Sequence, residues 1–165
     1  MLKRVLGLSA LALAILGGCG GDDAPPEPLV GLIDEAIVAI EEHYGAPQRY
    51  FEISAGLERV SVIVAVDDAT AAEQGYLDSD GGFTAPEPVG PATGSTFAAV
   101  AVAFDADRIF DELRRELDDP VIIDFAVRGG GDDTVIYDAS IASDAGGVLL
   151  VLLAPDGRIL GAQGQ

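Results

Sequence analysis

The fold class follows from residues 29–66, which read LVGLIDEAIVAIEEHYGAPQRYFEISAGLERVSVIVAV. Over residues 29–44 the apolar side chains recur every three or four positions, which is the spacing of one helix face. Gly45 follows directly and is typical of a helix end. Residues 49–55 alternate and residues 58–67 are rich in valine, so both stretches predict half-buried strands. A helix that leads into such a pair of strands predicts an α+β fold with an antiparallel sheet.

The remaining sequence predicts further elements by the same reasoning. In the first strand, alternation places Phe51, Ile53 and Ala55 on one side and Tyr50 on the other. A strand with two apolar faces, typical of a central position, is expected over residues 96–104. The other expected elements are a hairpin turning at 78–82, a linker loop over 84–96, a helix over 105–117 capped by Asp105, and strands over 121–128, 134–142, 148–154 and 158–162.

The order of these elements repeats along the chain. Pro47 corresponds to Pro120, at an offset of 73 residues, and the Asp-Gly turn at 80–81 corresponds to the turn at 156–157, at an offset of 76. The alternative is coincidence, because many α+β chains place prolines and turns in this way. We therefore predict an antiparallel sheet with two main helices on one face, built from two similar α-β-β-β units. The predicted boundaries are residues 29–83 for the first unit, 84–96 for the linker, and 97–165 for a strand followed by the second unit.

The first nineteen residues have the pattern of an export signal. Lys3 and Arg4 are followed by an apolar stretch of twelve residues, which is too short to cross a bilayer as a helix but fits a signal-peptide core. The stretch ends in Leu16-Gly17-Gly18-Cys19, which resembles the lipobox of bacterial lipoproteins. The alternative is an ordinary secretory signal in which the cysteine occurs by chance.

The lipobox resemblance implies a defined processing pathway. Residues 1–18 would be removed, and Cys19 would carry acyl chains such as palmitate, of which two suffice for stable anchoring. Residues 19–28 are rich in glycine, proline and acids and therefore predict a flexible tether. We accordingly expect the protein to be anchored in the cell membrane or the outer membrane, facing away from the cytoplasm.

Net charge restricts the range of partners. The chain carries 28 Asp and Glu against nine Lys and Arg, a formal charge of −19, and loss of Lys3 and Arg4 would make it −21. Nucleic-acid binding is not expected, because phosphates are normally bound by clustered basic side chains. A protein with a basic face is the expected partner, although the acids can also serve solubility alone. At 49% hydrophobic residues the chain is too apolar to be disordered.

No pattern in the sequence predicts a catalytic or metal site. His43 is the only histidine and is expected to pack beside Ala36 and Ile40 near a helix end. The glycines at 129–131 lack the Lys-Ser/Thr of a phosphate loop and predict a flexible hairpin loop, and the acids at 78–80 lack the remaining ligands of a calcium loop. Among 28 acids some pair will always fit the spacing for glycoside hydrolysis, so carboxylate pairs do not predict that activity. The processed chain would have no lysine, which pyridoxal phosphate chemistry requires. Asp105, Asp107 and Asp111 cluster at the start of the second predicted helix, where acids stabilise the helix dipole. We therefore expect no catalytic residue, metal or cofactor.

The mature part loosely resembles PepSY and beta-lactamase-inhibitor-like modules of bacterial envelope proteins. It also resembles small two-repeat envelope lipoproteins through residues 40–51, IEEHYGAPQRYF, and residues 64–68, VAVDD. The resemblance implies a fold and an envelope location and carries no catalytic residue. We expect a non-enzymatic envelope lipoprotein that binds or modulates another component. The alternative is a sensory or ligand-binding module of PAS or Cache type, which a mixed five-stranded sheet with an internal cavity would favour.

Overall fold

The computed structural model describes residues 26–142 and 146–164. The first half of the described chain comprises η1 (Val30–Leu32), α1 (Ile33–Tyr44), β1 (Arg49–Gly56), β2 (Arg59–Val66), β3 (Ala71–Asp78) and β4 (Phe83–Pro91). The second half comprises β5 (Phe97–Ala98), η2 (Ala99–Ala101), α2 (Ala106–Glu116), β6 (Val121–Gly131), β7 (Thr134–Ala142), β8 (Val148–Leu153) and β9 (Ile159–Gly164).

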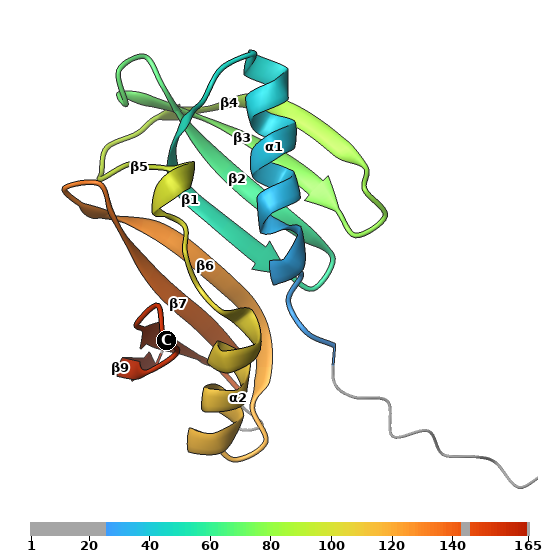
Figure 1. Cartoon of the computed structure of the whole chain (residues 1–165), viewed down its shortest axis with the longest axis vertical. Coiled ribbons are helices and arrows are strands. Elements are labelled where there is room, and N and C mark those ends of the chain that lie inside the picture. Colours follow the sequence, from blue (N-terminus) through green and yellow to red (C-terminus); the bar gives the residue numbers. More distant parts are fainter. Residues whose placement is uncertain (1–25, 143–145, 165) are drawn as a thin grey trace, which may run out of the picture.

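The strands form a single antiparallel sheet. Its order is β4-β3-β2-β1-β6-β7-β8-β9, and β5 pairs with one end of β1 (Figure 1). At the centre β1 pairs with β6, from Glu52 opposite Arg128 to Gly56 opposite Asp124. The predicted α+β class is confirmed, but the sheet is larger than the predicted units. Each half contributes a helix and a meander of four strands, and both meanders join in one sheet.

A continuous apolar layer lies on the sheet face that the helices cover. Paired strands place their core residues side by side, so that one fully buried row crosses six strands from β3 to β8. Because successive side chains on a strand point to opposite faces, the alternating valines of β2 all fall on this side, as predicted. The row consists of Leu77, Val60, Ala55, Phe125, Ala139 and Val151.

Both helices lie on that same face of the sheet (Figure 1). The predicted helix ends are confirmed: Gly45 follows α1 with φ +70°, and Asp105 caps α2 by accepting a hydrogen bond from the Arg108 amide at 3.1 Å. The buried side chains are Ile33, Ala36, Ile37 and Ile40 on α1, and Ile109, Phe110 and Leu113 on α2.

The prediction of a linker loop over residues 84–96 is wrong for most of its length. Residues 83–91 form β4, which pairs with β3 at one edge of the sheet. Its prolines, which suggested a loop, are compatible with an edge strand because they lack only the amide proton that an inner strand would need. Residues 92–96 make the actual connection.

The central strand predicted over residues 96–104 is also wrong. Only Phe97 and Ala98 pair, opposite Tyr50 and Arg49 at one end of β1. From Glu52 onward β6 pairs with the same edge of β1. Residues 99–101 therefore cannot continue the pairing with β1 and form η2 instead. Val100 in η2 is 91% exposed, although the alternating pattern suggested a buried position.

A β-bulge changes the predicted facing of side chains in β1. The register with β2 shifts between Tyr50 and Glu52, so that Tyr50 is fully buried beside Val64, whereas Phe51 is only partly buried. Simple alternation predicted the opposite for these two aromatic residues. Ile53 and Ala55, beyond the bulge, are buried as predicted.

Candidate functional site

The open face of the sheet carries a group of charged side chains at its centre. Among the described residues no helix lies on this face, which is opposite to α1 and α2 (Figure 1). Glu52 of β1 lies opposite Arg128 of β6, and Asp138 of β7 lies opposite Ala126, the residue two positions before Arg128. Asp124, two positions before Ala126 on β6, completes the group. We call Glu52, Asp124, Arg128 and Asp138 the central charged cluster.

Arg128 connects two of the three acids. Its Nε atom lies 3.2 Å from Oε2 of Glu52 and 3.3 Å from Oδ2 of Asp138. The Arg128 side chain is half exposed, whereas the Asp138 side chain is only 2% exposed. Arg128 therefore bridges neighbouring strands and places its charge beside an acid that solvent does not reach.

Asp138 is incompletely satisfied in this arrangement. Its Oδ1 atom is buried and has no hydrogen-bond partner. Burial raises the pKa of Asp138, Arg128 opposes this shift, and Glu52 adds to it. A buried carboxylate with one free oxygen is costly for stability, and such groups in native proteins call for an explanation.

Asp124 is affected by the same surroundings. Burial, followed by the charges of Glu52 and Asp138, raises the pKa of Asp124 to about 6, against the opposing effects of Arg128 and a hydrogen bond with Ser54. Three acids thus surround a single guanidinium group. The excess of negative charge in the cluster favours a cationic group.

Apolar side chains border the cluster on the same face. Ile136 lies opposite Arg128 and is 43% exposed, and Leu152 lies opposite Asp138 and is 41% exposed. The two side chains place exposed apolar area directly beside the charges of the cluster.

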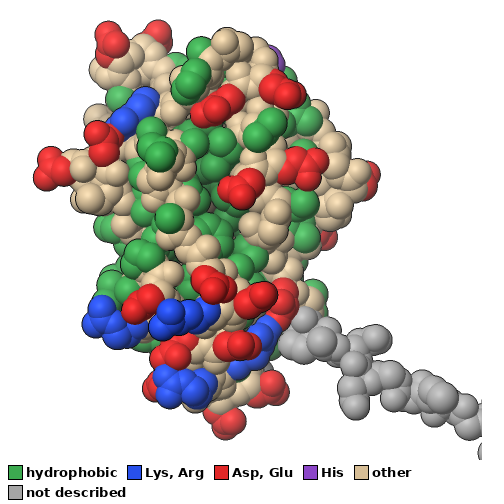
Figure 2. Space-filling view, in the orientation of Figure 1, with side chains coloured by type: hydrophobic (Ala, Val, Ile, Leu, Met, Phe, Trp, Pro, Cys, Tyr) green, Lys and Arg blue, Asp and Glu red, His purple; other side chains and the backbone are tan. Residues whose placement is uncertain are grey.

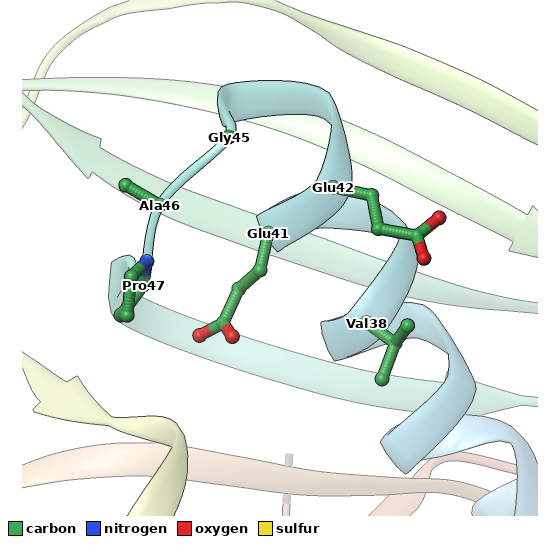
Figure 3. Close-up of a pocket in the computed structure, with 6 residues that line it drawn as sticks. All are labelled: Val38, Glu41, Glu42, Gly45, Ala46 and Pro47. Atoms are coloured by element: carbon green, nitrogen blue, oxygen red, sulfur yellow. The ribbon is translucent and has the colours of Figure 1, made fainter.

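A shallow depression lies at the end of α1 and is a second candidate site (Figure 3). It is lined by Val38, Glu41, Glu42, Gly45, Ala46 and Pro47. Glu41 accepts hydrogen bonds from the Tyr50 hydroxyl at 3.2 Å and from the Gln48 amide at 3.3 Å, so its carboxylate has a structural role. Burial and the charge of Glu41 raise the pKa of Tyr50. The depression is therefore a weaker candidate than the central charged cluster.

His43 does not pack where the sequence suggested. It is exposed in the last turn of α1, while Ala36 and Ile40 are buried on another side of the helix. Its ring lies 6.3 Å from that of Phe83, measured between centroids. The predicted position near the helix end is confirmed, and the predicted packing beside Ala36 and Ile40 is wrong.

The glycines at 129–131 form part of β6 and are not a flexible loop. The turn itself consists of Asp132 and Asp133, which have φ values of +50° and +60°. A Cβ atom on Gly129 would lie 2.1 Å from the Ser95 carbonyl oxygen. This glycine is required because the connection before β5 passes directly over β6.

The other acids noted in the sequence have local structural roles. Asp80 accepts a hydrogen bond from the Gly82 amide at 3.0 Å in the β3–β4 turn. Asp111 pairs with Arg114 at 3.4 Å, one helical turn along α2. Residues 26–142 and 146–164 contain no group of three or more metal-ligating side chains that could hold an ion. The predicted lipidation site, Cys19, lies outside the described residues.

Sequence reasoning did not single out the central charged cluster. The sequence feature that could have indicated the cluster is the presence of three acids inside strands that are otherwise apolar, where Asp in particular is uncommon. These acids are Glu52, Asp124 and Asp138. Only the pairing of β1, β6 and β7 shows that these acids share one face.

Comparison with known proteins identifies a similar fold. No protein-family model matches the chain, and no curated protein matches it. The crystal structure of a "putative lipoprotein" from Clostridium difficile 630 superposes with a TM-score of 0.62. The match covers 87% of this chain and 97% of that chain at 11% sequence identity, and this likeness shows a shared fold. These comparisons give no support to the PepSY-like resemblance, which rests on the order of elements alone.

Proposed function

We propose that this chain is a non-enzymatic lipoprotein of the cell envelope, anchored through lipid on Cys19, that binds another envelope component. The observation that carries the proposal is Leu16-Gly17-Gly18-Cys19 at the end of a signal-like segment. The description of the Clostridium difficile protein as a lipoprotein supports it, because the two proteins share a fold over most of both chains. The anchor would lie in the cell membrane or the outer membrane, with the domain outside the cytoplasm.

The surface we assign to partner binding is the open face around the central charged cluster. Glu52, Asp124 and Asp138 outnumber Arg128, and the whole chain is strongly acidic, so a basic face on another protein is the best electrostatic match. Ile136 and Leu152 supply apolar contact area beside these charges. Neither metal nor nucleic acid is part of this proposal.

The alternative, a PAS- or Cache-type ligand module, fits the observed topology less well. Such a module was expected to show a mixed five-stranded sheet around a cavity. The described strands instead form one wholly antiparallel sheet of two successive meanders.

We also infer that the two halves arose by duplication. Counted outward from the central pair, the strands follow the chain order β1 to β4 on one side and β6 to β9 on the other, and a helix precedes each meander. Superposition of residues 29–91 on residues 105–164 tests this inference, and a different placement of the helix on its four-stranded meander in the two halves would contradict it.

Lipid anchoring is tested by labelling cells with a palmitate analogue. The wild-type chain should incorporate the label and fractionate with membranes, whereas Cys19→Ser should remain unlabelled and unprocessed or soluble. A matched control, Ser9→Ala in the signal core, should behave like the wild type. An unlabelled wild-type protein that is soluble would refute the anchor.

Partner binding is tested by photo-cross-linking in cells. A photoreactive residue is placed at Ile136 on the open face and, as the control, at Val100 on the opposite side, because both side chains are exposed. A discrete adduct with one envelope protein from position 136 only would support the proposal. Equal adducts from both positions, or none from 136, would contradict the assignment of this face.

A further inference from the structure

The residues on either side of Pro28 contact the rest of the domain. Glu27 forms an ion pair with Arg114 of α2, and the Leu29 amide donates a hydrogen bond to the Gly56 carbonyl at 2.9 Å. Pro28 is buried between them. The chain therefore enters the domain beside α2 and the end of β1.

Few residues separate this point from the proposed anchor. Seven residues, Gly20 to Pro26, separate Cys19 from Glu27, and this segment spans at most about 29 Å when fully extended. The eleven residues of β6 alone extend for roughly 36 Å. The tether thus keeps the α2 side of the domain near the membrane and holds the far end of α1 away from it.

Arginine side chains gather at this same end of the molecule. The processed chain would have seven arginines, of which Arg108, Arg114 and Arg115 lie on α2 and Arg158 lies in the turn before β9. Figure 2 shows basic side chains, in blue, gathered at the lower end of the domain. The turn contacts the first part of α2, since a Cβ on Gly157 would lie 3.0 Å from the Cα of Ile109.

Two of these arginines are available for binding. Arg108 and Arg158 are exposed, and neither forms an ion pair within the described part of the chain. Arg114 and Arg115, in contrast, pair with acids of α2 or with Glu27. The planar guanidinium group binds phosphate oxygens through paired hydrogen bonds.

We infer that the α2 end of the domain is its membrane-facing surface, with Arg108 and Arg158 contacting phosphates of the lipid headgroups. This inference rests on the proposed anchoring at Cys19. The acids on α2 limit the attraction, so the lipid holds the protein at the membrane and the arginines orient it. The open face and the far end of α1 then remain accessible to partners.

The test uses the full lipidated chain in vesicles of phosphatidylcholine, with or without phosphatidylglycerol. Lipid occupies the natural cysteine, so Asp107→Cys on α2 and Ala46→Cys beyond α1 each provide one exposed labelling site. Energy transfer from the attached fluorophore to labelled headgroups should be severalfold higher for Asp107→Cys. Adding Arg108→Gln and Arg158→Gln should reduce this transfer, whereas the control pair Arg49→Gln and Arg59→Gln should not.

The outcomes separate this inference from the proposed function. Equal transfer from both positions on vesicle-bound protein would overturn the membrane-facing assignment and leave the anchor intact. Transfer from Asp107→Cys that falls when phosphatidylglycerol is added would overturn the role of the arginines. A chain that carries no lipid and does not bind vesicles would instead refute the proposed function.

Discussion

Asp138 lies with its Oδ2 atom 3.3 Å from Nε of Arg128, yet its other carboxylate oxygen is buried without a partner. The arrangement makes Arg128 the countercharge for an acid that has little contact with solvent. Isolated buried charges are strongly unfavourable, so the stability of the sheet centre depends on this pair remaining together.

Removal of Arg128 should therefore be destabilising. Arg128→Gln leaves Asp138 without a countercharge and should lower the free energy of unfolding by about 2–3 kcal/mol, less than for a fully buried pair because Arg128 is half exposed. Denaturant titration measures this change. The double variant Arg128→Gln with Asp138→Asn should recover much of the loss, since the buried charge is then absent. Arg59→Gln, which breaks an exposed pair with Asp78 and the contact of the guanidinium with the Tyr76 ring, should cost about 1 kcal/mol or less.

The central charged cluster should also make stability depend on pH. Because the folded protein raises the pKa of Asp124 from 3.8 to about 6, the folded state holds a proton that the unfolded state has released over this range. The contribution of Asp124 is thus fully present below pH 3.8 and is lost as the pH rises to about 6. Asp124→Asn should reduce the dependence measured by urea unfolding across this range, and the part that remains is due to Asp138, whose pKa burial also raises.

Ser54→Ala provides a directional check on that pH dependence. The hydrogen bond with Ser54 lowers the pKa of Asp124, so its loss should move the transition to higher pH. A shift to lower pH would contradict the assignment of the transition to Asp124. Chemical shifts of the Asp124 carboxyl carbon report the titration directly.

The close crossing of residue 95 over β6 predicts an intolerant glycine. In Gly129→Ala the new methyl group would meet the Ser95 carbonyl and should destabilise the protein by about 2–3 kcal/mol. Gly161→Ala on β9 is the control, because nothing lies within 4 Å of the position its Cβ would take. Equal thermal stability of the two variants would show that the crossing is not close.

Tyr137 should hold the connection between η2 and α2. Its hydroxyl accepts a hydrogen bond from the Ala103 amide and donates one to the Ala103 carbonyl, each at 2.9 Å. Tyr137→Phe should cost about 1 kcal/mol, because water can partly replace the lost bonds at exposed Ala103. Amide exchange should accelerate at residues 99–104 while β7 remains protected, and uniform acceleration would indicate a global effect instead.

Local periodicity predicted most elements correctly because their patterns reflect a single buried face. The valines of β2 and the apolar arc of α1 are examples, since each is explained by burial against one layer. The bulge at Phe51 escaped prediction because it depends on how β1 pairs with β2. The strand predicted over residues 96–104 was wrong for a similar reason. The alternation from Phe97 to Phe104 favours a strand, but β6 already occupies the side of β1 on which this segment would pair.

The candidate site was less predictable than the fold. Asp138 is separated from Glu52 by 86 positions, and only the antiparallel pairing of β1, β6 and β7 places both beside Arg128. In a chain with 28 acids, no local pattern distinguishes these three from solvent-exposed ones. Lipidation of Cys19, in contrast, is a prediction that the sequence alone supports, because the lipobox-like pattern at residues 16–19 is contiguous.

Lipid attachment at Cys19 is the central claim, and mass spectrometry of the N-terminal peptide from protein isolated from its own cells tests it most directly. We predict that the mature chain begins at Cys19, that the peptide carries a diacylglyceryl group on the Cys19 sulfur, and that no peptide from residues 1–18 remains. An unmodified Cys19 thiol within the chain, or a mature N-terminus at any other residue, would contradict the account.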